Sequence, residues 1–143
     1  MASHNSYLPN YSFEVRINGR SFGFSRVNNI SGSVEYDTII NGGHNDAPVI
    51  MLKPKRTPDM IVFEKGLKSD LSDVVFSLLT EGKKVDSIII FVKLNGKIKR
   101  IFAISSGIIV RREFAPLDAV GDQVLLEMLQ IAHTGLTEIP LPI

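Results

Sequence analysis

Alternating apolar and polar residues recur along most of this chain, and they predict a protein built mainly from strands. Residues 13–17 alternate with one apolar face, and Asn18-Gly19 then suits both central positions of a type I′ turn. We therefore expect residues 22–24 to return on an antiparallel partner. Further alternating runs predict strands at 33–40, 60–64, 108–114 and 124–129.

A second hairpin is predicted over residues 87–104, with Asn95-Gly96 at its centre. A two-residue loop fixes which residues face each other across the two strands. The expected pairs are Leu94 with Lys97, Val92 with Lys99, and Phe91 with Arg100. Residues 88–91 are apolar on both faces, so we expect the second face to be covered by a helix, another sheet or another subunit.

One segment has the period of an amphipathic helix instead. Its apolar residues recur at i, i+3, i+4, i+7 and i+8 within residues 69–81, which places them on one stripe. Ser69 or Asp70 can cap the start, Asp73 suits the positive end of the helix dipole, and Gly82 suits the end. We expect the helix to pack on a sheet through the stripe Leu71, Val74, Val75, Leu78 and Leu79.

The connection over residues 41–59 is long for a compact domain. Elements are usually joined by about 4 to 6 residues, so a connection of this length is functional, disordered or wrongly assigned. We interpret it as a functional loop that contacts neighbouring subunits. Residues 41–45 are polar and contain two glycines, so they can form a protruding hairpin tip, whereas residues 49–52 are apolar and costly to leave exposed together.

Composition limits the class of protein. The chain has 143 residues, 44% of them hydrophobic, a formal net charge of +1 and no cysteine, which predicts one domain over residues 1–143 without disulfides or thiolate chemistry. Its start lacks the profile of a signal peptide, and no apolar run reaches the ~18 residues of a membrane span. The fold we expect is mainly β, a β-sandwich or partly closed β-barrel of about seven strands with one flanking α-helix.

Candidate chemistry is sparse. His4, His44 and His133 are too scattered for a metal site, so we interpret them as ordinary surface or packing histidines. Ser105-Ser106-Gly107 lacks the preceding glycine of a nucleophile elbow, and Asn41-Gly42-Gly43 lacks the spacing of a phosphate-binding loop. The basic residues fall at turns with few aromatic residues between them, which argues against nucleic-acid binding. We expect no catalytic residue, metal ligand or cofactor.

Several motifs occur in a characteristic order and spacing. They are VRINGRSFGFSRVNNISGSVEY at 15–36, NGGHND at 41–46, LKPKRTPDMIVFEKG at 52–66, and LLEMLQIAHTGL at 125–136. Together they cover nearly the whole chain, and in this order the sequence resembles the tail tube proteins of contractile phage tails and related injection particles.

This resemblance implies a non-enzymatic structural subunit of an inner tail tube. The implied assembly is a hexameric ring whose inner strands join into one barrel around a lumen, with rings stacked into a tube. The implied partners are further copies of the chain, a sheath protein, and baseplate or tube initiator and terminator proteins, with cargo or DNA passing through and no stable membrane anchoring. The subunit would be made in the bacterial cytoplasm and end in a phage tail, tailocin or extracellular injection system.

Two sets of residues are candidates for this role. Lys97 and Lys99 are candidates for the lumen. The candidate inter-subunit and ring-stacking residues are Asn41, Gly42, Gly43, His44, Asn45, Asp46, Val49, Ile50, Met51 and Leu52. The alternative is a monomeric β-sandwich binding module that uses the 41–59 loop to hold a ligand or partner. Apolar residues on both faces of the second hairpin favour assembly, since a free monomer would have to cover both.

Overall fold

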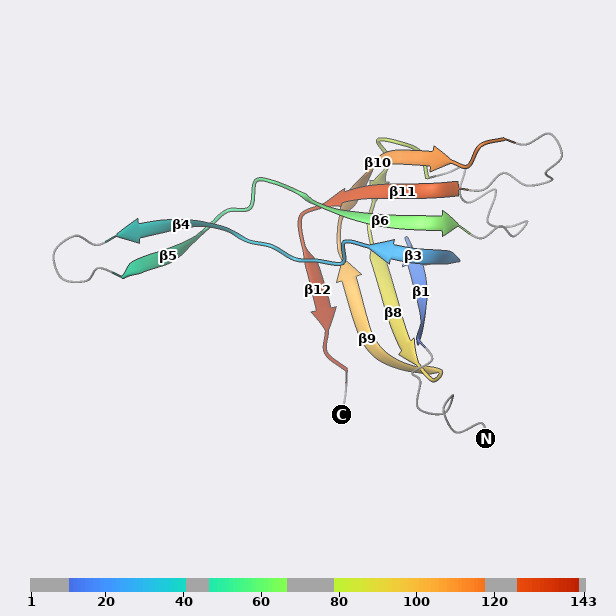
Figure 1. Ribbon diagram of the computed structural model, residues 1–143, viewed down its shortest axis with the longest axis horizontal. Helices are drawn as coiled ribbons and strands as arrows, with labels where there is room; N and C mark the ends of the chain where they lie inside the picture. Colours follow the sequence, from blue (N-terminus) through green and yellow to red (C-terminus); the bar gives the residue numbers. More distant parts are fainter. Residues whose placement is uncertain (1–10, 41–46, 67–78, 118–125, 142–143) are drawn as a thin grey trace.

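The computed structural model describes residues 11–40, 47–66, 79–117 and 126–141, and these form twelve strands (Figure 1). The strands are β1 (Tyr11–Ile17), β2 (Arg20–Phe22), β3 (Phe24–Asn28), β4 (Glu35–Ile40), β5 (Pro48–Lys53), β6 (Asp59–Gly66), β7 (Lys84–Val85), β8 (Ile88–Leu94), β9 (Lys97–Ile104), β10 (Gly107–Phe114), β11 (Leu126–His133) and β12 (Leu136–Ile139). The prediction of a mainly β fold is confirmed. The estimate of about seven strands was too low, because short strands such as β7 give no readable alternation.

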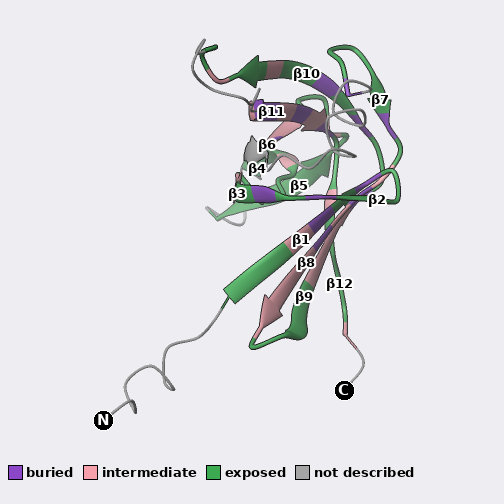
Figure 2. Cartoon of the chain, turned by 90° about the vertical axis from the view of Figure 1, so that its right-hand side faces the viewer, coloured by how far each residue is buried: buried purple, intermediate pink, exposed green. Residues whose placement is uncertain are grey.

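Ten of these strands form two open, antiparallel sheets. The first sheet has the order β12-β9-β8-β1-β2, and the second has the order β3-β6-β11-β10-β7. Figures 1 and 2 show the second sheet lying across one end of the first, with its strands running at a steep angle to those beneath. This is the crossed packing of a β-sandwich. Neither sheet closes into a barrel within the described part of the chain.

The core lies where the two sheets cross. The side chains facing inward from both sheets are buried, whereas the far ends of β1 and β9 are exposed and that of β8 is half-buried as these strands leave the sandwich (Figure 2). Phe24 contacts Phe63 with ring centroids 5.0 Å apart and ring planes tilted by 32°, at a separation usual for aromatic pairs. The core residues are Val15, Ile17, Phe22, Phe24, Ile61, Phe63, Leu79, Val85, Ile88, Ile90, Ile104, Ile109, Leu126, Leu129 and Ile131.

The first predicted hairpin divides between the two sheets. Its turn is confirmed, since Asn18 and Gly19 both have positive φ, at 52° and 82°. The predicted return over residues 22–24 does not stay on one partner, however. Phe22 ends β2 beside β1, and Phe24 begins β3 beside β6, so the chain changes sheets at Gly23. Both phenylalanines are buried and are two residues apart, so the alternating pattern alone predicted a single strand for them.

The second hairpin is confirmed, with a one-residue shift in its register. Leu94 faces Lys97 as predicted, but Val92 faces Arg100 and Phe91 faces Ile101. The predicted pairs Val92 with Lys99 and Phe91 with Arg100 are therefore wrong. The reason is a bulge that places one extra residue, Lys99, in β9, which a two-residue loop does not encode.

The two faces of this hairpin have different surroundings. Ile88 and Ile90 lie in the core, whereas Ile89 and Phe91 on the opposite face are only half-buried. The guanidinium of Arg16 lies 5.1 Å from the centroid of the Phe91 ring, close enough for a cation–π contact. In the single chain, the apolar second face is therefore partly open to solvent.

The predicted helix over residues 69–81 lies mostly outside the described residues, which resume at residue 79. Leu79, Thr80 and Glu81 are described and are not helical. Leu79 is nevertheless buried in the core, as expected for the last residue of the apolar stripe.

The 41–59 connection is not one loop. Pro48–Lys53 forms β5, which pairs with β4 in a two-stranded antiparallel sheet of its own. The strand was missed because residues 49–52 are a continuous apolar run, which lacks the period-two signal of a strand with one buried face. The predicted hairpin tip at residues 41–45 lies outside the described residues.

Candidate assembly surface

The β4–β5 pair, called the arm below, projects away from the sandwich (Figure 1). Six residue pairs hold its two strands together, from Glu35 with Lys53 at the base to Ile40 with Pro48 at the outer end. An isolated two-stranded hairpin is at best marginally stable in water, and further packing is normally needed. The arm is therefore a structure that gains stability when another surface covers it.

The two faces of the arm differ in chemistry. Because side chains alternate along a strand and paired residues share a face, the register assigns each residue to one side. One side, the apolar face of the arm, carries no charged residue: Tyr36, Thr38, Ile40, Pro48, Ile50 and Leu52. The other side, the mixed face, carries Glu35, Asp37, Ile39, Val49, Met51 and Lys53.

Exposure on the apolar face is high. Tyr36, Ile40, Ile50 and Leu52 are 59%, 70%, 68% and 74% exposed, although each is a large apolar side chain. Single exposed apolar residues are common on proteins, but a contiguous patch marks an interaction site. On the mixed face, by contrast, Lys53 and Asp37 form an exposed ion pair at 3.5 Å that suits contact with water. The apolar face is therefore the candidate contact face.

The base of the arm is held by Glu35, the first residue of β4. Its carboxylate accepts hydrogen bonds from the backbone N–H of Arg56 at 2.5 Å and from the N–H and hydroxyl of Thr57 at 3.2 and 3.0 Å. The Arg56 N–H is the main cause that lowers the pKa of Glu35, with the Thr57 bonds adding to it against an opposing effect of burial. Glu35 thus ties the entry of the arm to its exit.

A second contact at the base joins the arm to the sandwich. Lys55 Nζ lies 3.1 Å from Asp59 Oδ2 and donates a hydrogen bond of 2.6 Å to Ser33 Oγ, which itself lies 2.9 Å from Asp59 Oδ1. The side chains of Lys55 and Asp59 are both more than four-fifths covered. Ser33 precedes β4 and the other two follow β5, so this contact closes the base from both ends.

Each sheet also ends in short strands. The first sheet has β2 and β12 at its edges, and the second has β3 and β7, with lengths from two to five residues. Edge strands present unpaired N–H and C=O groups that pair readily with another chain. The two open sheets therefore offer four edges at which strands of another copy can add.

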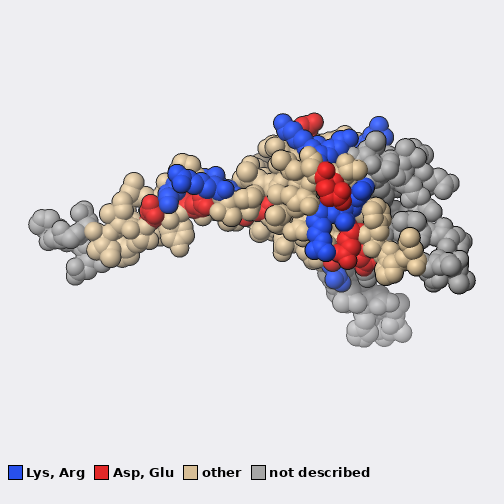
Figure 3. Space-filling model, turned by 90° about the horizontal axis from the view of Figure 1, so that it is seen from above, with Lys and Arg blue, Asp and Glu red and all other residues tan. Residues whose placement is uncertain are grey.

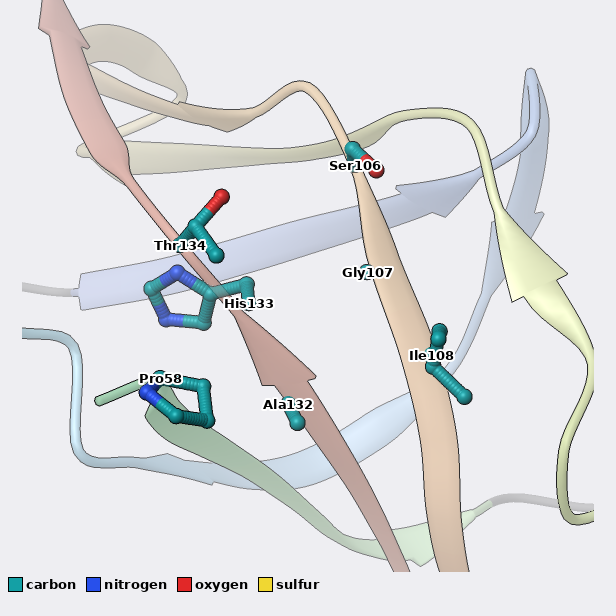
Figure 4. Close-up of a pocket in the computed structure, with 7 residues that line it drawn as sticks. All are labelled: Pro58, Ser106, Gly107, Ile108, Ala132, His133 and Thr134. Atoms are coloured by element: carbon teal, nitrogen blue, oxygen red, sulfur yellow. The ribbon is translucent and has the colours of Figure 1, made fainter. Parts of the chain in front are cut away.

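Two shallow cavities open on the sandwich. One, of about 190 Å³, is lined by apolar residues of β1, β3 and β8, including Tyr11, Phe13 and Val27. The other, of about 220 Å³, lies between β10 and the end of β11, beside His133 and Gly107 (Figure 4). Both fall below the ~300–1,000 Å³ of typical small-molecule sites.

The predicted contact residues separate into two places. Residues 49–52 lie on the arm and are exposed, and residues 41–46 lie outside the described part of the chain. Lys97 and Lys99 are exposed on β9 beside the hairpin turn at the free end of the first sheet. On the face that Figure 3 shows, acidic and basic side chains are interleaved among the described residues, without a broad surface of one sign.

Sequence reasoning missed three contact features. It named residues 49–52 but not Tyr36 and Ile40 of β4, which share the apolar face with Ile50 and Leu52, because the strand pairing was not foreseen. Apolar residues in both segments were a usable signal in the sequence, because two neighbouring strand-like segments suggest a hairpin. The roles of Glu35 and of the Lys55–Asp59 contact carry no sequence signal, because they depend on how the arm joins the sandwich.

The described residues contain no group of three or more His, Cys, Asp or Glu side chains arranged to hold a metal ion. Ser105 and Ser106 lie between β9 and β10, in the strand-end turn that the sequence indicated. Within the same described ranges, no helix is long and apolar enough to cross a bilayer.

No protein-family model matches the sequence. No curated protein matches it significantly either. Solved structures do share the fold. A chain in the sheath-tube complex of an extracellular contractile injection system, PVC, in the extended state aligns over 99% of both chains with a TM-score of 0.62 and 18% identity.

Two further structures agree. A chain in the PVC sheath/tube terminator in the extended state aligns over 93% of this chain and 96% of its own length, with a TM-score of 0.65 and 18% identity. A chain in the tube terminating cap of the anti-feeding prophage aligns over 92% and 90%, with a TM-score of 0.60 and 17% identity. The fold that the resemblance to tail tube proteins implied is therefore the fold of this chain, which it shares with components of contractile injection particles.

Proposed function

We propose that this protein is a structural subunit of the inner tube of a contractile injection particle, in which hexameric rings stack around a delivery lumen. The observation that carries the proposal is the apolar face of the arm, on a sandwich whose fold occurs in tube-bearing particles. A free monomer leaves this face in water, whereas repeated copies cover it. The arm then packs on an adjacent subunit and on the next ring.

Sheet edges support the ring. In a closed ring of identical subunits, an edge strand of one copy pairs with an edge strand of the next, which removes unpaired edges from the assembly. The half-buried face with Ile89 and Phe91 gains cover in the same way. Lys97 and Lys99 are proposed to face the lumen, and residues 41–46 and 49–52 are proposed to make the contacts between subunits and between rings.

The proposed partners follow from the particles in which the similar chains occur. Their structures are of a sheath-tube complex, a sheath/tube terminator and a tube terminating cap, so we propose a sheath protein and initiator or terminator proteins as partners here. The subunit has no enzymatic role in this account. It is made in the bacterial cytoplasm and functions in a phage tail, tailocin or extracellular injection system, through which cargo or DNA passes.

A monomeric binding module is the competing function. The proposed gripping loop is instead a two-stranded arm directed away from the sandwich, and the two cavities lined by described residues are smaller than typical ligand sites. These observations favour assembly.

Negative-stain electron microscopy of the purified chain, with sedimentation of the same sample, tests the proposal. Rings or hollow tubes with a mass of six subunits per ring are expected, either alone or after addition of an initiator protein from the same particle. A uniform monomer under both conditions would refute the tube function, and ligand screening would then be directed at the arm.

A further inference from the structure

His133 is the one polar side chain that the described residues bury in the core. It ends β11, is 2% exposed, and lies in register with Asp59 of β6 and Gly107 of β10. Neither ring nitrogen makes a hydrogen bond of good geometry to a described residue. Figure 4 shows the ring beside Pro58, on the segment that leads from the arm into β6. A buried imidazole thus lies at the point where the arm joins the sandwich.

The charged groups facing this ring come from the base of the arm. Among the described residues these are the Asp59 carboxylate and the Lys55 ammonium, which form their own contact at 3.1 Å. The residue of neighbouring β10 that pairs with His133 is Gly107, which has no charge. The turn after β11 places only the backbone of Gly135 near the ring. His133 therefore lies opposite Asp59 in the sheet, beside the Lys55–Asp59 ion pair, so a charge on its ring acts electrostatically on both members of that pair.

The resting state of this cluster is a neutral histidine beside an ionised aspartate. Burial lowers the pKa of His133, Lys55 adds to this effect, and the Asp59 carboxylate and the Gly135 backbone oppose it with a smaller effect. Burial acts to raise the pKa of Asp59, but the hydrogen bonds from Ser33 and Lys55 outweigh it and leave the pKa below its ordinary value. Near neutral pH, Lys55 is thus the cation that pairs with Asp59, while Ser33 donates a hydrogen bond to the same carboxylate.

We propose that Ser33, Lys55, Asp59 and His133 form a proton-operated latch that fixes the arm near neutral pH and releases its base under mildly acidic conditions. A proton on His133 adds a second cation beside the single Asp59 carboxylate. His133 is fixed in the centre of its sheet by pairing on both sides, whereas Lys55 lies in the link between β5 and β6. Lys55 is therefore the group that moves, and with it goes the bond to Ser33 at the entry of the arm.

The sign of the pH dependence follows from the direction of the shift. Opening moves Lys55 away and leaves His133 buried in its sheet, so it relieves only the part of the pKa lowering that Lys55 causes. The ring therefore has a higher pKa in the open state than in the closed one and binds fewer protons when closed. The closed state is favoured above the open-state pKa of the ring and is lost as the pH falls below it. One proton changes the open population by at most about tenfold per pH unit. The latch is a property of the single chain, so it does not depend on the proposed tube.

Hydrogen exchange of the full chain tests the latch. After correction for intrinsic rates, amide exchange in β4 and β5 is expected to rise between about threefold and tenfold from about pH 7.5 to about pH 5.5. His133→Gln removes the titrating group and is expected to abolish this rise, and Lys55→Met is expected to give fast exchange at both pH values. The control His44→Gln, which changes a histidine between the two arm strands in sequence, is expected to keep the rise. A rise that persists in His133→Gln would overturn the proposal.

A second measurement uses the wild-type chain and does not depend on how the variants fold. The ring protons of His133 report its titration by NMR, and the arm amides report opening in the same samples. Coincident midpoints are expected for a latch. Arm opening at a pH where the His133 ring does not titrate would overturn the proposal.

Discussion

The apolar face of the arm makes a quantitative prediction about assembly. Ile50 and Leu52 lie on this face, 68% and 74% exposed in the single chain, and the double variant Ile50→Ser/Leu52→Ser removes both without adding charge. Full burial of an Ile or Leu side chain is worth about 1.5–3 kcal/mol, so covering the exposed part of each contributes about 1–2 kcal/mol, or about 2–4 kcal/mol for the pair. The variant is expected to lose this amount at every arm contact.

The assay is the protein concentration at which assemblies form, measured by sedimentation under conditions in which the wild-type chain assembles. Since each 1.4 kcal/mol is a factor of ten, the double variant is expected to need a concentration higher by about 30-fold to about 700-fold. Because both positions are exposed in the monomer, its free energy of unfolding is expected to change by less than about 1 kcal/mol. The two measurements therefore separate an effect on assembly from an effect on the stability of the monomer.

The matched control is Asp37→Ser/Lys53→Ser on the mixed face. It also replaces two exposed arm residues by serine, and it removes an ion pair that, being exposed, is worth about 0–1 kcal/mol. Assembly close to the wild-type concentration is expected. Equal assembly of the apolar-face variant and the wild type would refute the reasoning, as would an equal loss in both double variants.

Three further predictions concern stability. Gly107→Ala is expected to lower the free energy of unfolding in urea by about 1–3 kcal/mol, because a Cβ there would lie 2.8 Å from Ile131 Cγ2. The control Gly135→Ala adds a Cβ that meets nothing within 4 Å and is expected to leave the free energy of unfolding nearly unchanged. Asn18→Gly keeps the positive φ but loses two hydrogen bonds that the Asn18 side chain accepts from backbone N–H groups, so its free energy of unfolding is expected to fall by about 1–3 kcal/mol. A larger fall is expected for Asn18→Ala, and equal stability of both variants and the wild type would contradict this. Glu35 has a lowered pKa, so its contribution to the stability of the arm base is present above the ordinary value of 4.5 and is lost as the pH falls through its lower folded value. Over that pH range, hydrogen exchange at the arm base is expected to rise in the wild type and not in Glu35→Gln.

The strands and turns that sequence predicted well are those governed by local rules. Period-two alternation located β1 and β4, and Asn-Gly located both hairpin turns with positive φ at each asparagine. These signals depend on neighbouring residues alone. The strand pattern and the mainly β class could therefore be predicted without the structure.

Features that depend on distant parts of the chain could not be predicted. The change of sheet at Gly23 is set by which partner each phenylalanine meets, and the bulge at Lys99 appears only once β8 and β9 are paired in register. That residues 41–46 and 49–52 contact other subunits remains a prediction, and the pairing of the strand at residues 48–53 was missed because an apolar run carries no period. The role of His133 likewise required the register that brings Asp59 beside it.

Cryo-electron microscopy of the assembled particle tests the central claim most directly, because it places the arm relative to neighbouring copies. The account predicts a hollow tube with six subunits in each ring and with Ile50 and Leu52 of every arm buried against an adjacent copy. Assemblies in which the apolar face of the arm projects into solvent, or a chain that stays monomeric with an initiator present, would contradict it.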